Sequence, residues 1–326
     1  MNKNTKFIGI DISKDTFDIW SEESGHHMFQ NNLRGFKSFI KNIPDEAWCV
    51  MEYTGSYYQQ LALFLFDKGV NVSVINPLVI RRFIQMKLQH NKTDKSDAKM
   101  IAVYAQDQPV KRWKPKPKYI DECKALNASI ALYLKQRTAL KNILHSLKSK
   151  NVKGIIILSL KRQIKQIQKE ITLLENQIEL LIKENEPELL TNLISISGIG
   201  KKTALLLISS TNAFSSFENH KQLSAYFGLA PAEKTSGTSI KTRSRITKKG
   251  NPLIRNHLFL CSFTACEHNP QCKALYKRIV DKGKSKKLAL IVVCNKLLKQ
   301  VFAEAKSGIP YDPYYKSRLT LNNFSF

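Results

Sequence analysis

The hydrophobic pattern of the first third of the chain alternates between the periods of strands and helices. Buried apolar runs predict strands at 6–13, 47–55 and 70–77, alternation of polar and apolar residues predicts one at 15–20, and 26–31 is a candidate for a further strand. Helical spacing predicts helices at 33–43 and 56–69, another through Arg82, and a last one from about Thr93 to Gln106. This order predicts an α/β layer in which an antiparallel meander is followed by parallel crossovers.

The pattern changes after a Pro/Lys-rich connector at 109–120. Residues 121–149 are predicted to be helical. Over 160–184 the apolar residues recur at alternating steps of four and three, which is the a/d spacing of a heptad repeat. An ordinary packed helix also carries apolar repeats, but three sustained heptads favour a coiled coil, either folded back on 121–149 or formed between subunits. Pro187 is predicted to end it.

Of the composition, the net charge says most about which partner the chain binds. Fifty-two Lys and Arg against 26 Asp and Glu give a net charge of +26, which indicates a polyanionic partner, with nucleic acid first and an anionic membrane surface second. No apolar run is long enough to span a bilayer and no signal peptide is present, so we expect a cytoplasmic protein. The six cysteines form no CxxC and are interpreted as reduced, mostly buried thiols.

Four acidic residues occupy positions where carboxylates could converge. Asp11 ends the first predicted strand, Glu52 ends a later one, and Asp94 and Asp97 are neighbours on one helix face, with Cβ atoms about 5–6 Å apart. Strand ends in such sheets open onto a shared crevice. Converging carboxylates repel one another unless they bind cations, so the sequence predicts a Mg²⁺ or Mn²⁺ site, with a pair of ions as used in phosphodiester cleavage.

The alternative for Asp94 and Asp97 is a solvated helix face, neutralised by the lysines around them. If the metal site forms, these lysines lie off the carboxylate edge, where they could meet phosphates; they are Lys92, Lys95 and Lys99. Three other acids have no comparable position and are interpreted as surface groups: Asp15, Asp18 and Asp45. The order of the four acids along the chain is similar to that of the RNase H/RuvC-like nuclease fold.

The stretch SGIGKKTA predicts a helix-hairpin-helix, in which Gly198 and Gly200 let the backbone approach a phosphate and Lys201 and Lys202 add charge. A plain tight turn between helices is the alternative. Residues 233–252 form a basic segment rich in Ser, Thr and Gly, which is predicted to bind phosphates. Its cations are Lys234, Lys241, Arg243, Arg245, Lys248 and Lys249. Helices are predicted from about Leu253 to Lys306.

Taken together, these motifs resemble the DEDD transposases, the insertion-sequence transposase family related to the Piv/MooV DNA invertase. The resemblance rests on FIGIDISKDTFDIW, VMEYTGSYYQQLALFLFDKG, KTDKSDAKMIAVYA, ISGIGKKTALLLIS and FGLAPAEKTSGTSIKTRSRITKKGNP. It implies that Asp11, Glu52, Asp94 and Asp97 form the metal-binding tetrad. It also implies a serine nucleophile, matched here by Ser236; Thr238 stands where the family often has a second Gly, which leaves Ser239 and Thr235 as alternatives.

The resemblance further implies recombination through a Holliday-junction-like intermediate, a homo-oligomer such as a dimer or dimer of dimers, and in some relatives a structured guide RNA. The expected organisation follows the motifs. It is a RuvC-like catalytic domain at 1–112, a helical coiled-coil region at 113–192, a C-terminal transposase domain at 193–312 and a tail at 313–326.

Three other functions share parts of this pattern. A hydrolytic RuvC-like junction endonuclease would use the four carboxylates without Ser236. An actin-like sugar kinase would use GIDIS as a phosphate loop, although a second Gly-rich phosphate motif is missing. A non-catalytic nucleic-acid-binding protein would need only the basic charge.

Overall fold

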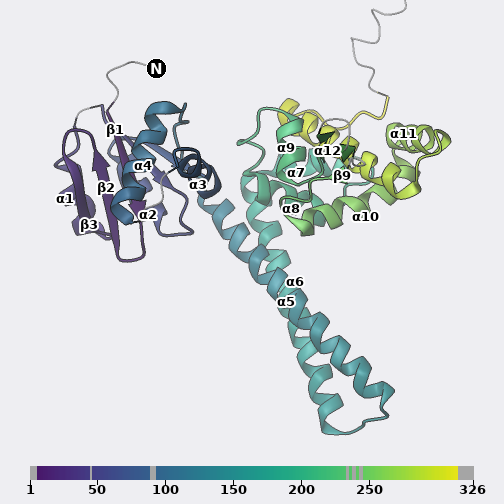
Figure 1. The fold of residues 1–326 in the computed structure, drawn as a ribbon. Helices are drawn as coiled ribbons and strands as arrows, with labels where there is room; N and C mark the ends of the chain where they lie inside the picture. Colours follow the sequence, from purple (N-terminus) through teal and green to yellow (C-terminus); the bar gives the residue numbers. More distant parts are fainter. Residues whose placement is uncertain are drawn as a thin grey trace, which may run out of the picture. The chain divides into compact units, whose positions relative to one another are not determined.

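The structure, a computed structural model, describes residues 6–44, 46–88, 93–232, 235–236, 240–241 and 245–314. The chain divides into two compact units, 1–115 and 116–326 (Figure 1). Within the described ranges, no helix combines the length and the apolar character needed to cross a membrane.

The first unit is built on a five-stranded mixed sheet in the order β3-β2-β1-β4-β5. Its strands are β1 (Phe7–Ile12), β2 (Thr16–Ser21), β3 (Gly25–Gln30), β4 (Trp48–Glu52) and β5 (Asn71–Ile75). β1, β2 and β3 pair antiparallel, whereas β4 pairs parallel with both β1 and β5. The meander followed by parallel crossovers is therefore confirmed.

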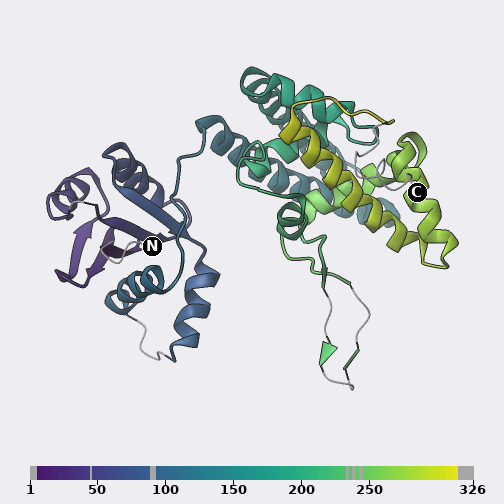
Figure 2. The same ribbon diagram turned by 90° about the horizontal axis from the view of Figure 1, so that it is seen from above.

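Helices cover both faces of this sheet (Figure 2). They are α1 (Leu33–Ile40), α2 (Tyr58–Asp67), α3 (Pro77–Met86) and α4 (Asp94–Asp107). Because side chains alternate along a strand, Ile8 and Ile10 of β1 pack in one core with α1 and α2, while Phe7 packs with α3 and α4 on the opposite face. The face that carries Phe7 also carries Asp11.

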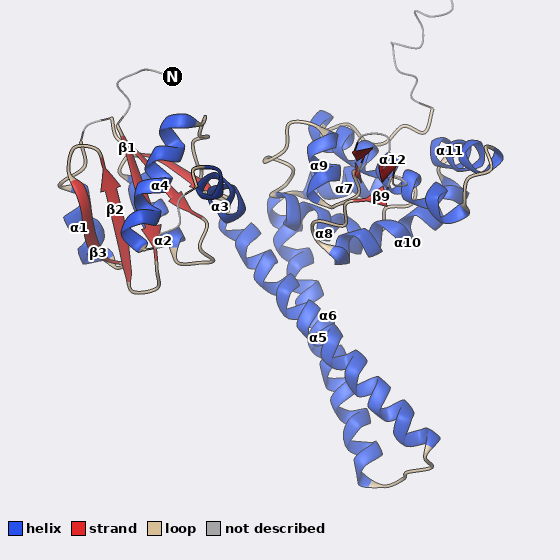
Figure 3. Ribbon diagram, in the orientation of Figure 1, coloured by secondary structure: helices blue, strands red, loops and turns tan. Residues whose placement is uncertain are grey.

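The second unit begins with two long helices, α5 (Lys118–Ser149) and α6 (Ile155–Asn185), which run side by side as an antiparallel hairpin (Figure 3). Ile171 and Ile178 of the predicted heptad seam are buried at the base of this hairpin, in the same core as the helices that follow. α6 ends at Asn185, and Pro187 opens the next helix. A supercoiled coiled coil stays a prediction.

The rest of this unit is mainly helical. Its helices are α7 (Pro187–Ser195), α8 (Lys201–Thr211), α9 (His220–Tyr226), α10 (Pro252–His268), α11 (Pro270–Asp281) and α12 (Lys286–Ser307). Two short antiparallel pairs interrupt them. β6 (Pro231–Ala232) pairs with β9 (Arg245–Ile246), and β7 (Thr235–Ser236) pairs with β8 (Ile240–Lys241). The division into 113–192 and 193–312 stays a prediction.

Candidate catalytic and nucleic-acid-binding site

A glycine brings α4 directly onto the sheet beside Asp11. A Cβ atom added at Gly9 would lie 2.1 Å from the carbonyl oxygen of Ala98 and 2.5 Å from the backbone nitrogen of Ala102. Only a residue without a side chain leaves room for the helix backbone at this depth. Gly9 precedes Asp11 by two residues on the same face of β1, so the close approach also sets the distance between Asp11 and the first turn of α4.

The first turn of α4 carries Asp94 and Asp97. The helix begins with a capping box in which Thr93 Oγ1 accepts from the Ser96 backbone nitrogen and Ser96 Oγ accepts from that of Thr93. This cap fixes where the helix starts and therefore which residues occupy its first turn. Asp94 is exposed, whereas Asp97 is half-buried, as are Asp11 and Glu52 at the ends of their strands.

Three of the predicted carboxylates act electrostatically on the fourth, Asp11. Burial raises the pKa of Asp11 from its ordinary 3.8 to about 6, and negative charge on Asp97 and Glu52 adds to this rise. Asp94 acts in the same direction. The four residues are therefore near neighbours in space although they are up to 86 positions apart in sequence. This mutual repulsion is what a bound cation would relieve.

The donor set fits a hard divalent cation, because carboxylate oxygens are the ligands that Mg²⁺ and Mn²⁺ prefer. Among the described residues, no three Asp, Glu, His or Cys side chains converge closely enough to hold one ion together. A favourable interaction of Asp94 and Asp97 with the helix dipole is a second reason for acids in this turn. It does not account for the raised pKa of Asp11, which lies on a different element.

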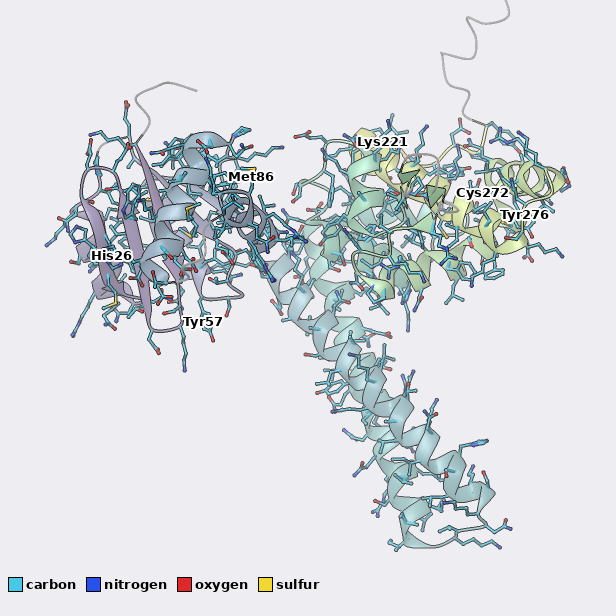
Figure 4. All side chains as sticks on the ribbon, viewed as in Figure 1. His26, Tyr57, Met86, Lys221, Cys272 and Tyr276 are labelled. Carbon is cyan, nitrogen blue, oxygen red and sulfur yellow. The ribbon has the colours of Figure 1, made fainter. Side chains whose placement is uncertain are left out.

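Asp18 was predicted to be a surface group, and this is wrong. Only 8% of Asp18 is exposed, and its Oδ1 lies 2.6 Å from Nε2 of His26 on the neighbouring strand. Figure 4 labels His26 on the first unit. Asp18 is the direct cross-strand partner of Asp11, so both side chains project from the same face of the sheet. Its charge also contributes to the raised pKa of Asp11.

A sequence signal for Asp18 existed, because it lies inside a strand rather than at a turn. Phe17 and Ile19 on either side of it are buried, and a turn closed by Ser13 and Thr16 sets the register with β1. The pattern alone could not give that register. Asp15 is exposed as predicted, and Asp45 lies outside the described residues.

The lysines near α4 have different surroundings. Lys95 is exposed, and the ammonium group of Lys99 lies 5.5 Å from the centre of the Trp20 ring, a cation–π contact. Lys92 lies outside the described residues. Phosphate contact by these lysines stays a prediction, and for Lys99 the Trp20 ring is a competing partner.

The glycines between α7 and α8 have separate structural roles. Gly198 has φ +108°, and a Cβ there would lie 2.7 Å from the Ala265 Cβ of α10, so packing requires this glycine. Gly200 is the N-cap of α8 and has open space around it. Phosphate binding by the two glycines, and the helix-hairpin-helix itself, stay predictions.

The two lysines that follow this turn contact acids of the helical hairpin. Nζ of Lys201 lies 2.8 Å from Glu179, and Nζ of Lys202 lies 2.7 Å from Glu175, both on α6. These ion pairs join α8 to α6. Any DNA contact by Lys201 or Lys202 would therefore compete with an existing carboxylate partner.

The basic segment emerges from a tightly packed base. A Cβ at Gly228 would lie 2.0 Å from the Lys249 carbonyl oxygen, and one at Gly250 would lie 2.1 Å from that of Tyr226. Nη1 of Arg255 donates to the carbonyl oxygens of Phe227 and Gly250. These contacts hold the two ends of the segment together before the β6–β9 pair begins.

Only part of the basic segment lies within the described residues. The backbone of Ser236 pairs with that of Ile240 in the β7–β8 ribbon, and Thr235 pairs with Lys241. Exposed cations follow the ribbon at Arg245, Lys248 and Lys249. The remaining predicted residues lie outside the described ranges: Lys234, Ser239 and Arg243. Phosphate binding by this segment stays a prediction.

Comparison with known proteins matches most of the chain to transposases. A family model of IS110-type DEDD transposases matches residues 8–149, and a second, described as Transposase IS116/IS110/IS902 family, matches residues 190–277. The pilin gene-inverting protein of Moraxella bovis is 32% identical over 323 residues, with 94% of this chain and 97% of the relative covered. The transposase for insertion sequence element IS1111A of Coxiella burnetii is 23% identical over 335 residues, covering 90% and 88%.

The fold, the carboxylates gathered near Asp11 and these relatives define the class: a transposase, an enzyme that cleaves DNA and transfers its strands. The N-terminal α/β unit is consistent with a DEDD/RuvC-like domain. The chain belongs to the IS110/IS116/IS902 family of DEDD transposases.

Proposed function

We propose that this transposase recombines DNA with a divalent-metal site held by Asp11, Glu52, Asp94 and Asp97. The observation that carries the proposal is the raised pKa of Asp11, caused by its burial and by the neighbouring carboxylates. A cluster of this kind gains stability from a cation, and the DEDD family typically uses a divalent metal. The Gly9 contact supports the proposal because it holds α4 against the strand that carries Asp11.

Bound Mg²⁺ or Mn²⁺, as a pair of ions, would neutralise charge on the scissile phosphate and polarise it. The protein's own part is to fix the donors. β1 and β4 hold Asp11 and Glu52 at neighbouring strand ends, and the Thr93 cap holds the first turn of α4. Rigid elements place a site more precisely than loops do.

We infer further that Ser236 is the nucleophile. Its hydroxyl oxygen would form a bond to phosphorus while the bond from phosphorus to one deoxyribose oxygen breaks, and that oxygen leaves with a proton. Basic residues nearby, Lys241 and Arg245 among them, would stabilise the charge that develops on the phosphate. The motif match and the basic context of the segment support this role.

Two variants test the chemistry on supercoiled DNA that carries the sequences flanking the coding region. With Mg²⁺, we expect Asp11→Ala to abolish cleavage, and we expect Ser236→Ala to abolish both strand transfer and the covalent protein–DNA adduct. Ser239→Ala is the matched control and should retain both. Cleavage by Asp11→Ala at the wild-type rate would refute the metal site.

A hydrolytic endonuclease is the second candidate, because it shares the four carboxylates but needs no serine. Ser236→Ala separates the two: full cleavage with no adduct in either protein would favour hydrolysis. The adduct is measured by denaturing gel electrophoresis of labelled DNA, which detects a covalent bond directly.

The resemblance also suggests partners besides DNA. We propose that the glycine turn before α8 contacts a DNA backbone as a helix-hairpin-helix, that the active form is a homo-oligomer, and that a structured RNA from the element guides it. Sequencing RNA that co-purifies with the protein tests the last point. A discrete species of reproducible sequence supports a guide, and random host RNA argues against one. Analytical ultracentrifugation gives the oligomer.

A further inference from the structure

The outer half of the α5–α6 hairpin is basic and has almost no core of its own. No residue from 131 to 170 is buried, and all of them lie within the described ranges. Buried hairpin residues such as Ile130 and Ile171 lie only at the base, where other helices pack against them. Lys, Arg and Gln are frequent in the outer half, and apolar side chains such as Leu132, Ile143 and Leu158 are exposed there as well, so this part of the hairpin is a solvent-exposed arm.

The charge of this arm has a single sign. Between Cys123 and Lys169 the sequence contains eleven lysines and arginines and no Asp or Glu. Acids return on α6 only from Glu170 onward, where Glu175 and Glu179 pair with lysines of α8. The two ends of the hairpin thus differ: the base is neutralised within the protein and the arm is not.

Part of this positive charge surrounds a groove that begins on the arm and continues along α6 to Leu180. Its volume is about 950 Å³, and its floor includes Leu144 and Ile164. The cations at its rim come from both helices: Arg137, Lys141, Lys161, Lys165 and Lys169. The four lysines are exposed. Arg137 has a structural task as well, because its Nη1 donates to Oε1 of Gln168 on the facing helix.

We propose that this groove, with its lysine rim, is a binding surface for the phosphate backbone of double-stranded DNA, outside the candidate catalytic site. The inference rests on the proposed function, because the groove would bind the same DNA that the catalytic site would cleave. The 19 residues of α5 from 131 to 149 span about 28 Å. Duplex DNA carries roughly 16 phosphate charges over that length.

Two other occupants fit less well. Single-stranded nucleic acid is held by aromatic side chains on which bases stack, and none of the residues that line the groove is aromatic. A second copy of the arm would bring two surfaces of the same net positive sign together, which costs free energy at moderate salt. Backbone binding to a duplex needs cations alone, and the arm supplies them.

The test replaces Lys141, Lys161, Lys165 and Lys169 together by Gln, a change that keeps helix propensity and leaves Arg137 in place. The control removes the same charge from the α1–α2 layer, on the sheet face away from Asp11, by replacing exposed cations with Gln: Arg34, Lys37, Lys41 and Lys68. Binding to a labelled 40-base-pair duplex is measured by fluorescence anisotropy between about 0.05 and 0.3 M salt.

Each phosphate contact contributes about 0.9 to the slope of log K against log salt. We expect the rim variant to lose up to about 3.6 of that slope, and its Kd at 0.15 M salt to rise from roughly fivefold for one lost contact to roughly a thousandfold for four. The control variant should keep the wild-type slope. Circular dichroism verifies that both variants remain folded.

Three results would overturn the inference. The first is equal DNA binding by rim and control variants. The second is loss of duplex RNA binding with DNA binding unchanged, which assigns the groove to RNA. The third is a change of oligomeric state in ultracentrifugation with DNA binding unchanged, which makes the groove an interface between copies. The Asp11→Ala variant separates this inference from the proposed function, because it should bind DNA normally and fail only in cleavage.

Discussion

Replacing Gly9 by alanine tests whether the contact between α4 and β1 builds the site. The new Cβ would lie 2.1 Å from the Ala98 carbonyl oxygen, and real Cβ contacts essentially never fall below 3.0 Å, so α4 must retreat by about 1 Å. Overpacking of this kind typically costs about 1–3 kcal/mol of unfolding free energy. A misplacement of about 1 Å at a catalytic site can lower the rate about 100-fold.

The assay compares Mg²⁺-dependent DNA cleavage per folded molecule with stability in urea. Gly35→Ala is the matched control, because a Cβ there would lie 2.0 Å from the Gln30 carbonyl oxygen, yet Gly35 lies on α1 across the sheet from Asp11. We expect both variants to lose stability, and only Gly9→Ala to lose cleavage by roughly 100-fold.

A double variant sharpens this test. Gly9→Ala combined with Ala102→Gly removes only the 3.0 Å contact with the Ala102 Cβ and leaves the clashes with backbone atoms. Cleavage should therefore not recover. The reasoning would be refuted if Gly9→Ala cleaved DNA as fast as Gly35→Ala, since the spacing of α4 on the sheet would then not set the site.

Three further predictions concern charges around the site and the hairpin. Without metal, the unfolding free energy should fall by at most about 3 kcal/mol as pH rises from about 4 to 6, because folded Asp11, with a pKa of about 6, keeps a proton that the unfolded chain releases. Urea titrations in EDTA measure this, and the fall should vanish with Asp11→Asn. Asp18→Asn should move the fall to lower pH by removing a negative charge that faces Asp11, and an unchanged midpoint would contradict that coupling. Glu179→Gln should free Lys201, together with Lys183, which pairs with the same carboxylate. Duplex binding at 0.15 M salt should tighten by roughly fivefold for each freed lysine that meets a phosphate; unchanged affinity would limit Lys201 to joining α6 and α8.

The sequence determined the order of the elements in the first unit. Strand and helix periods differ clearly there, so alternation and capping residues located β1 to β5 and α1 to α4 to within a few residues. It also located the carboxylates at strand ends and at the start of α4, because these positions are local. The net charge of +26 indicated a polyanionic partner without any structure.

Tertiary structure decided what depends on register and on packing between distant segments. Register set by a tight turn placed Asp18 opposite Asp11, and the missing side chain of Gly9 let α4 approach that face. Contacts between different elements placed the Lys99 ammonium group over the Trp20 ring and paired Lys201 with the carboxylate of Glu179. A sequence pattern specifies which side chains share a face, whereas only the assembled fold specifies which side chains face one another across it.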